Sequence, residues 1–277
     1  MGAGFVGRAS ADALKAEGVN AVALSRADVD LLAPDGAPRL ARHLTPATTL
    51  VLTSAVAPVK NSQMLLENLR MLQAVIEAVT TAPVAHLVYI SSDAVYADSD
   101  APMTEASPAA PNSLHGAMHL TREVMLTSEL AGIPQAFVRP TLIFGPGDPH
   151  NGYGPNRFMR LASAGRDITL FGEGEERRDH VFIDDVAEIV CRCVLHRATG
   201  IVNAVSGTVT SFREIAELAA ARFHPSVSVI GTPRVGAMPH NGYRAFDTRL
   251  LATLFPDSRR TTLANGLDRM KDSSTSR

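Results

Sequence analysis

Two histidines, His115 and His119, are the side chains best suited by type and spacing to carry out chemistry. They are four residues apart, so on a helix their rings lie on one face. An imidazole has an unperturbed pKa of about 6.5, and it can therefore give or take a proton near neutral pH. This spacing also occurs in metal sites, but no third ligand is evident, and Gly116 stands where a zinc protease would need Glu. The pattern favours acid–base chemistry, and we predict no metal site.

A strand, a turn and a helix must position these histidines. Residues 87–90 form an apolar run with β-branched and aromatic members, which predicts a strand. Ser92 and Asp93 place small polar side chains at its end. A loop rich in Pro, Ser and Asp follows, and Asn112 or Ser113 is then expected to cap the helix that carries both histidines.

The chain begins with the spacing G-x-G-x-x-G at Gly2, Gly4 and Gly7. Glycines there allow a tight turn and let backbone N–H groups approach a pyrophosphate at a helix N-terminus. A predicted helix over 5–17 and a predicted strand over 20–24 follow the glycines, as in dinucleotide-binding folds. The first strand of such a fold is missing before the turn. We therefore expect the working protein to start about six residues upstream, because the central slot of the sheet would otherwise be empty.

The end of the predicted strand over 20–24 carries Ser25 and Arg26. NAD-specific proteins have an acidic residue near this position, about 20 residues beyond the glycines, which binds the ribose hydroxyls. A small serine followed by an arginine suits a 2′-phosphate, which an acidic group would repel. We therefore predict NADP as the cofactor, with NAD left open.

These motifs together resemble the extended short-chain dehydrogenase/reductase family, the epimerases, dehydratases and reductases of nucleotide sugars. P-N-S-L-H-G-A-M-H is similar to the family's P-x-S-x-Y-G-x-x-K, with His115 in place of Tyr and His119 in place of Lys. R-P-T-L-I-F-G-P-G and G-E-G-E-E-R-R-D-H-V resemble two further family segments. The resemblance covers roughly residues 2 to 270.

The resemblance implies roles for the residues at the strand end and on the helix. Ser92 would donate a hydrogen bond to the reacting oxygen. His115 would replace the family's Tyr as acid–base, and His119 would hydrogen-bond a ribose hydroxyl in place of Lys. Glu123, one turn further along the helix, is expected to raise the pKa of His119.

Ligand contacts are predicted at further positions. Arg178 and Arg244 are assigned by the resemblance to the nucleotide diphosphate, because a guanidinium binds phosphate in a bidentate manner. Tyr153 and Asn156 are polar residues in a Gly/Pro-rich loop, a common place for ligand contacts. The predicted cofactor contacts are Gly2, Gly4, Phe5, Val6, Gly7, Ser25, Arg26, Asp30, Ser54, Ala55, His119 and Pro140. The predicted substrate contacts are Asp93, Tyr153, Asn156, Arg178 and Arg244.

The expected fold is α/β, a Rossmann-like doubly wound parallel sheet with a smaller C-terminal substrate lobe. Residues 1–145 with 179–210 are predicted as the dinucleotide-binding domain, and 146–178 with 211–270 as the substrate lobe. The polar tail 271–277 is predicted to be disordered. Apolar residues at helical spacing over 62–79 indicate a buried face. In the family such a helix also forms a homodimer together with the helix over 113–130.

Composition narrows the classes of function. The chain has 277 residues and a net charge of -2, which favours neither nucleic acid nor a membrane surface as a partner. It has no apolar run of about 18 residues and no basic-then-apolar leader, so we expect a cytoplasmic protein. Cys191 and Cys193 lie two apart on a predicted helix and do not face each other, so neither a disulfide nor a metal site is expected.

The sequence therefore predicts an NAD(P)-dependent nucleotide-sugar epimerase or reductase with a histidine acid–base. Dehydratases of the family have an Asp-Glu pair after the Ser/Thr, whereas Ala94 follows Asp93 here, so elimination is not expected. A non-catalytic relative that binds a nucleotide or a sugar is the alternative. Which nucleotide sugar reacts, and at which carbon, does not follow from the sequence.

Overall fold

The computed structural model describes residues 3–275, which divide into two compact units. The first unit comprises the chain up to Ala97, Glu105–Pro140 and Ala187–Ala204. The second comprises Asp98–Thr104, Thr141–Val186 and the residues from Val205 onward. The sequence predicts crossings between the two after residues 145, 178 and 210. The structure has them after 140, 186 and 204, and it also assigns 98–104 to the second unit.

A parallel sheet forms the centre of the first unit. The elements of this unit are α1 (Phe5–Ala16), α2 (Gly36–Ala41), β1 (Thr49–Leu52), α3 (Ser62–Thr81), β2 (His86–Ile90), the 3₁₀ turn η1 (Asp93–Val95), α4 (Leu114–Glu129), β3 (Gln135–Pro140), most of α6 (Ile183–Leu195) and β7 (Gly200–Ala204). The strands lie in the order β1-β2-β3-β7, and each pairs with its neighbours in parallel.

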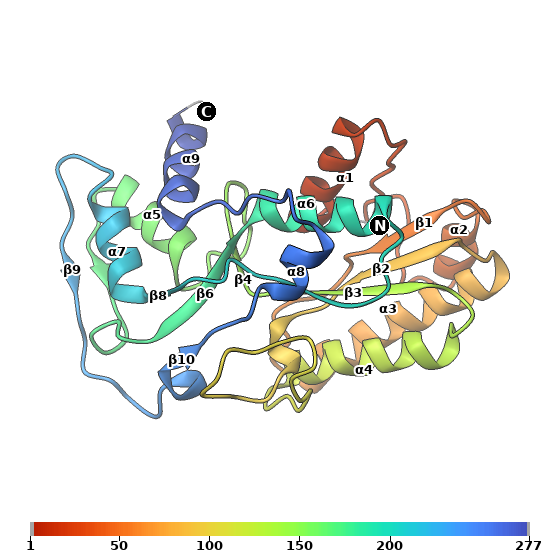
Figure 1. Ribbon diagram of the computed structural model, residues 1–277, viewed down its shortest axis with the longest axis horizontal. Coiled ribbons are helices and arrows are strands. Elements are labelled where there is room, and N and C mark those ends of the chain that lie inside the picture. The colour runs from red at the N-terminus through yellow and green to blue at the C-terminus, as the bar shows by residue number, and fades with distance from the viewer. Residues whose placement is uncertain (1–2, 276–277) are drawn as a thin grey trace. The chain divides into compact units, whose positions relative to one another are not determined.

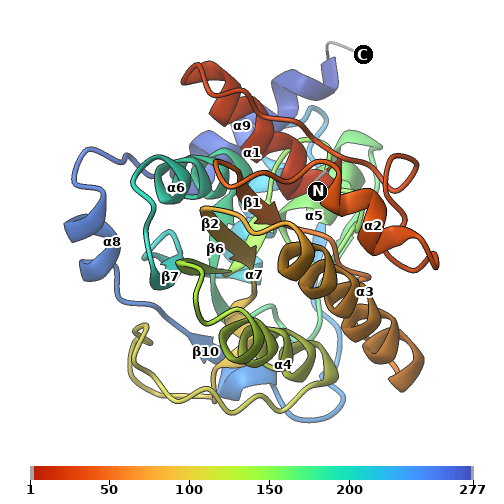
Figure 2. The ribbon, with the colours of Figure 1, turned by 90° about the vertical axis from the view of Figure 1, so that its right-hand side faces the viewer.

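Helices cover both faces of this sheet. Figures 1 and 2 show α3 and α4 side by side on one face and α1 and α6 on the other. The strands of such a sheet are buried on both faces and therefore read as apolar runs. In β2 all five residues are buried. The main core lies between the sheet and the helices α2, α3 and α4, with Leu52, Leu72 and Leu87 among its members. The predicted α/β, Rossmann-like fold is confirmed.

One predicted strand is wrong. Within the described chain, residues 20–24 form no strand, and the side chain of Val22 is 67% exposed. In a doubly wound sheet this segment would lie between the first and third strands. Here β1 pairs with β2, with Thr49 opposite His86, and residues 20–24 pair with no strand of the described chain. An apolar pattern alone cannot form a strand where no neighbouring strand pairs with it.

The second unit contains a smaller mixed sheet. Its elements are β4 (Leu142–Phe144), α5 (Pro155–Ser163), β5 (Ile168–Thr169), β6 (Arg177–Phe182), β8 (Val209–Ser211), α7 (Phe212–Ala220), β9 (Val229–Ile230), the 3₁₀ turn η2 (Pro239–Gly242), β10 (Tyr243–Arg244), α8 (Arg249–Leu254) and α9 (Leu263–Thr275). The order is β10-β6-β4 with parallel pairing, and β8 adds antiparallel to β6. Strands β5 and β9 form a separate two-stranded ladder.

The predicted disordered tail is partly helical. Helix α9 continues past Lys271 as far as Thr275. Leu267 and Met270 on this helix are buried, so its apolar face packs against the second unit and carries the helix onward.

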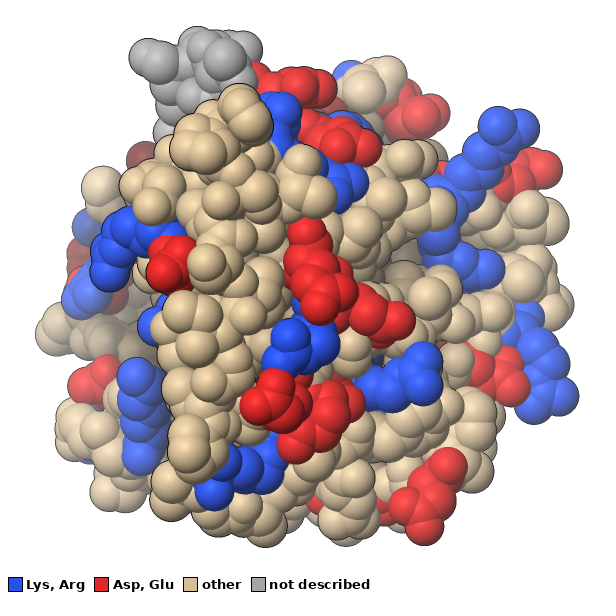
Figure 3. Space-filling model, turned by 90° about the vertical axis from the view of Figure 1, so that its left-hand side faces the viewer, with Lys and Arg blue, Asp and Glu red and all other residues tan. Residues whose placement is uncertain are grey.

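The surface charges and the character of the helices agree with the near-neutral composition of the chain. Figure 3 shows one face of the molecule, on which acidic and basic side chains alternate. Across residues 3–275, no helix combines the length and the apolar character that crossing a membrane requires.

Candidate active site

Helix α4 begins close to the end of β2. Ser113 caps it, since its hydroxyl accepts a hydrogen bond of 3.1 Å from the N–H of Gly116. Gly116 faces the carbonyl of Ala94 so closely that a Cβ there would lie 2.0 Å from that oxygen. Only glycine allows this approach. The approach sets His115, the preceding residue, beside the turn that contains Ser92.

Ser92 lies at the start of η1, at the carboxyl end of β2. Its hydroxyl oxygen accepts a hydrogen bond of 3.1 Å from the N–H of Ala94. The Asp93 carboxylate is 3.5 Å away from the hydroxyl, at the limit of a hydrogen bond, so the hydroxyl hydrogen can turn toward a ligand oxygen. Asp93 itself is buried.

The two histidines pack against each other and against Tyr89. The rings of His115 and His119 meet edge to face, with centroids 4.7 Å apart. His119 is 5% exposed, and its Nδ1 lies 2.7 Å from the hydroxyl of Tyr89 on β2. Tyr89 is fully buried, and burial raises its pKa to about 12. The sequence analysis did not identify Tyr89 as part of the site.

Arg122 is a second residue that the sequence analysis missed. It lies three residues after His119 and is fully buried. Its Nη1 donates a hydrogen bond of 2.9 Å to the carbonyl of Ser54, and its guanidinium lies 4.9 Å from the ring centroid of Tyr89. Burial first, and then the charges of His115 and Arg122, hold the pKa of His119 well below its usual value of 6.5.

The expectation that Glu123 raises the pKa of His119 is wrong. The Glu123 carboxylate forms a buried bidentate ion pair with Arg139 of β3, at 2.9 and 2.5 Å. The hydroxyl of Ser91 donates a further hydrogen bond of 2.5 Å to it. Because its charge is compensated by Arg139, this carboxylate does not stabilise an imidazolium at His119.

The turn after β1 carries the predicted cofactor contacts Ser54 and Ala55. Asn68 of α3 fixes this turn, because its buried amide accepts from the N–H of Val56 and donates to the carbonyl of Val56, both at 3.0 Å. The carbonyl of Ser54 is held by Arg122. The side chain of Ala55 is exposed, so a ligand can approach the turn there.

The glycine-rich segment starts a helix, as predicted. Gly4 is the N-cap of α1, and it forms no side-chain cap. The first N–H groups of the helix, from Phe5, Val6 and Gly7, therefore remain available to bind an anion. A Cβ on Gly4 would meet nothing within 4 Å, so the space above this turn is open. Gly2 lies outside the described residues. These observations fit a dinucleotide phosphate. Pro140, another predicted contact, is buried at the end of β3 opposite Ala204.

The predicted ribose-binding residues lie in a turn on the surface. The carboxylate of Asp28 accepts from the N–H and the hydroxyl of Ser25, at 2.7 and 2.6 Å. Arg26 pairs with Asp30 at 3.1 Å, and the Arg26 side chain is 78% exposed. An ion pair this exposed contributes little stability, so Arg26 can exchange Asp30 for a ligand phosphate.

The two predicted phosphate-binding arginines are neighbours in the second unit. Strands β10 and β6 pair in parallel, with Arg244 opposite Arg178. Arg178 pairs with Glu176 at 3.1 Å. Arg244 is fully buried and donates to the carboxylate of Asp98 at 3.0 Å, and His240 contacts the same carboxylate at 2.5 Å. The structure thus brings together two arginines that are 66 positions apart in the sequence.

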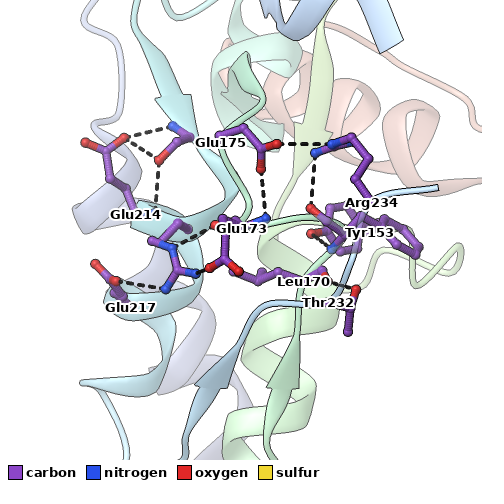
Figure 4. Close-up of polar contacts among 11 residues, drawn as sticks. Tyr153, Leu170, Glu173, Glu175, Glu214, Glu217, Thr232 and Arg234 are labelled. Carbon is purple, nitrogen blue, oxygen red and sulfur yellow. Dashed lines mark hydrogen bonds and ion pairs between the residues drawn. The ribbon is translucent and has the colours of Figure 1, made fainter. Parts of the chain in front are cut away.

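Tyr153 and Asn156 are held within the second unit. The Tyr153 hydroxyl accepts a hydrogen bond of 3.0 Å from the N–H of Phe171, and its ring packs on that of Phe171, with centroids 4.6 Å apart. Figure 4 shows Tyr153 beside the Arg234–Glu175 ion pair. The buried amide of Asn156 accepts from the N–H and donates to the carbonyl of Gly145, at 3.1 and 2.7 Å, so it shapes the G-P-G turn.

Across residues 3–275, no group of three or more His, Cys, Asp or Glu side chains is placed to hold a metal ion. Cys191 and Cys193 are free thiols, both buried. Burial raises the pKa of the Cys193 thiol to about 12, so it is protonated and inert at neutral pH.

Comparison with known proteins finds nucleotide-sugar epimerases among the relatives of this chain. A UDP-glucose 4-epimerase from Mycolicibacterium smegmatis is 33% identical over 168 residues, which are 58% of this chain and 54% of the relative. The chain thus spans about half the length of the curated relatives it matches. The crystal structure of UDP-N-acetylglucosamine 4-epimerase from Bacillus cereus has a TM-score of 0.85 at 20% identity, over 99% of this chain and 94% of that one. The structure of RMD from Pseudomonas aeruginosa complexed with NADPH has a TM-score of 0.83 at 20% identity, over 99% and 97%.

At 20% identity, the two solved structures show that this chain shares their fold. The family follows from the sequence, because residues 2–205 match the model of the NAD dependent epimerase/dehydratase family. The described part of the match includes the turn before α1, the strand end with Ser92, and the helix with His115 and His119. The chain therefore belongs to the NAD dependent epimerase/dehydratase family.

Proposed function

We propose that this protein is an NAD(P)-dependent epimerase or reductase of a nucleotide sugar, with His115 as its acid–base. One observation carries the proposal. Gly116 packs on the Ala94 carbonyl and thereby sets His115 beside the Ser92 turn, which supports a role for His115 at the position of the family's Tyr. The first unit would bind the cofactor and the second the substrate.

The proposal gives a role to the candidate site residues of the first unit. The nicotinamide cofactor, when bound, supplies the hydride acceptor or donor. The N–H groups at the start of α1 and the small turn at Ser54 and Ala55 would hold it. The Ser92 hydroxyl donates a hydrogen bond to the reacting sugar oxygen, and His115 takes or returns the proton of that oxygen.

The exposed Arg26 supports NADP over NAD. A guanidinium that is 78% exposed and held by one weak ion pair is available for a 2′-phosphate. The Asp28 carboxylate at Ser25 acts in the opposite sense, since it would accept ribose hydroxyls. One structural relative contains NADPH, and the family is named for NAD.

The second unit supports a substrate with a diphosphate. Arg178 and Arg244 lie opposite each other on paired strands, and two guanidinium groups so placed suit two linked phosphates. Relatives named for UDP-sugars favour the same class of substrate.

The face formed by α3 and α4 is proposed as the homodimer interface. The two helices pack side by side on one face of the sheet. Each leaves a large apolar side chain exposed, Leu66 at 48% and Val124 at 56%. A second copy of the same face would cover them.

A screen of nucleotide-diphospho sugars with NAD(H) and NADP(H) tests the activity. On a substrate that turns over, His115→Ala should lose about 10²- to 10⁴-fold in rate. His43→Ala, at an exposed histidine remote from α4 in sequence, is the control and should keep the rate. Full turnover by the His115→Ala variant would move the acid–base role elsewhere.

A non-catalytic binding protein is the second candidate function. The observation in its favour is that both His115 and His119 replace residue types on which the family's chemistry depends. Calorimetric titration separates the two candidates. Tight binding of cofactor and of nucleotide sugar, without turnover of any sugar in the screen, would support the binding protein.

A further inference from the structure

We infer that Tyr89 and Arg122 hold His119 as a neutral imidazole with its proton on Nε2, and so make it a fixed hydrogen-bond donor to a ligand oxygen. The identity of that ligand, a ribose hydroxyl of the nicotinamide cofactor, rests on the proposed function. The state of the imidazole does not, because it follows from contacts within β2, α4 and the turn after β1.

The first step is the position of Tyr89. Side chains alternate along a strand, so Leu87 and Tyr89 share the face of β2 that packs on α3 and α4. This face brings the Tyr89 hydroxyl to 2.7 Å from Nδ1 of His119, one turn after His115. The phenol is enclosed, and burial raises its pKa to about 12, so it keeps its hydrogen at any pH near neutrality.

The second step is the direction of this hydrogen bond. The guanidinium of Arg122 lies against the Tyr89 ring, and a guanidinium can only donate. We therefore assign the hydroxyl hydrogen of Tyr89 to Nδ1 of His119, which lies 2.7 Å away and can accept it, whereas Arg122 cannot. When Nδ1 accepts, the single proton of a neutral imidazole must sit on Nε2. Nε2–H is then the ring edge that is left for a ligand.

The third step is the charge of His119. The ionisable groups that face it are Tyr89 from β2, and His115 and Arg122 from α4. Glu123 follows on the same helix, but its carboxylate is bound by Arg139 of β3. Burial and the two neighbouring cationic or potentially cationic groups all oppose a proton on His119. The imidazole therefore stays neutral.

The fourth step concerns Arg122 itself. It is fully buried, and one of its nitrogens donates to the Ser54 carbonyl. Its Nε and Nη2 have no partner within the described structure. A buried guanidinium that no carboxylate compensates is costly, and residues kept in such a state usually have a role. Here Arg122 supplies a permanent positive charge next to His119. The family's lysine both donates a hydrogen bond and carries a positive charge. Here His119 would donate the hydrogen bond, and Arg122 would carry the charge.

Nitrogen-15 NMR of the ligand-free full chain, labelled at histidine, tests the inference without any activity. Long-range proton–nitrogen correlations distinguish a protonated ring nitrogen from an unprotonated one, and His119→Gln assigns the signal. We expect an Nε2–H tautomer of His119 from pH 8 down to pH 5.5. An Nδ1–H tautomer, or a charged imidazolium of His119 at pH 6, would overturn the inference.

Variants of the two positioning residues sharpen the test. In Tyr89→Phe, Nδ1 loses its donor, so the His119 signal should become an average of both tautomers while the other histidine signals keep their positions. In Arg122→Met the titration midpoint of His119 should rise, and in Arg122→Lys, which keeps the charge, it should stay low. Equal midpoints in the Met and Lys variants would remove Arg122 from the inference.

Cofactor titration separates this inference from the proposed function. If the protein binds NAD(P)(H), Tyr89→Phe should weaken binding by about 2- to 10-fold, the range of one hydrogen bond. If the tautomer is as expected but neither cofactor binds, the proposed function fails and the inference about His119 stands. If cofactor binds and sugar turns over while the tautomer is Nδ1–H, the inference alone fails.

Discussion

His180 provides a test of the second unit through the pH dependence of stability. This histidine is in β6, it is 6% exposed, and neither ring nitrogen has a partner within the described structure. Its ring meets Phe212 edge to face, with centroids 5.5 Å apart. Burial, and then the charge of Arg178, lower its pKa to about 3. The folded protein therefore holds His180 neutral at a pH where the unfolded chain protonates it.

The sign and the size of the pH effect on stability follow from the difference between the pKa of His180 in the folded state and in the unfolded state. Between pH 6.5 and pH 3 the unfolded state binds the additional proton, so stability falls as the pH falls through this window. At pH 5 the cost for one such histidine is about 2 kcal/mol relative to pH 7, with an unfolded pKa of about 6.5. His180→Phe removes the titration and keeps an aromatic ring against Phe212. The variant should lose about 2 kcal/mol less than the unmodified protein between pH 7 and pH 5.

Urea unfolding followed by circular dichroism at pH 7 and pH 5 measures this difference. The matched control is Val22→Phe, which adds an aromatic ring at a side chain that is 67% exposed and removes no ionisable group, so its loss between the two pH values should equal that of the unmodified protein. An identical acid response of the His180→Phe variant and the unmodified protein would show that His180 is protonated or solvated in the folded state, which contradicts the burial argument.

Three further outcomes follow from the first unit. Gly116→Ala should cost about 1–3 kcal/mol in urea unfolding, because its Cβ meets a backbone carbonyl, whereas Gly132→Ala, in open space, should cost far less. Equal losses of unfolding free energy in the two variants would contradict the close approach of Gly116 to the Ala94 carbonyl. Glu123→Gln leaves Arg139 buried without its carboxylate and should lower the unfolding free energy by about 3–5 kcal/mol; an unchanged urea midpoint would argue against that pair. Arg26→Ala should weaken NADP(H) binding by about 10- to 100-fold and leave NAD(H) binding unchanged in calorimetry, and preferred binding of NAD(H) by the unmodified protein would refute the assignment.

Local signals in the sequence predicted much of the first unit. Ser113 caps α4 as one of the two expected residues, because a serine before an apolar helical run satisfies the free N–H groups of the first turn. The apolar run over 87–90 forms β2, since a strand buried on both faces needs apolar residues throughout. In the second unit a local signal of the same kind is realised at Ser211, which caps α7 with Glu214 closing a capping box.

Features that depend on distant partners were predicted less well. The segment 20–24 has the composition of a strand, but strand formation needs a neighbouring strand to pair with, and no strand of the described chain pairs with this segment. Glu123 lies one turn after His119, yet it binds Arg139, which is distant from His119 in sequence and adjacent to Glu123 only in the folded unit. Helical spacing shows which side chains share a face, and it does not show which partner outside the helix each one meets.

In the candidate site, too, residues marked by a local motif were predicted, and residues defined by their contacts in the fold were not. The motif spacing located Ser92, His115 and His119, because the family's segments keep their register even where residue types change. It did not locate Tyr89, which reads as an ordinary core residue of a strand, or Arg122, which reads as a solvated residue of a helix. A signal was present for Arg122, since an arginine three residues after His119 shares its helix face.

The burial of Arg122 also limits the routes by which this sequence can change. A lysine at position 119, the family's residue type, would set an ammonium against a guanidinium in an enclosed space. Two such charges 4 Å apart repel by about 4 kcal/mol at an effective dielectric constant of about 20. A lysine at position 119 should therefore destabilise the fold while Arg122 is present, and it should be tolerated better once Arg122 is replaced by an uncharged residue.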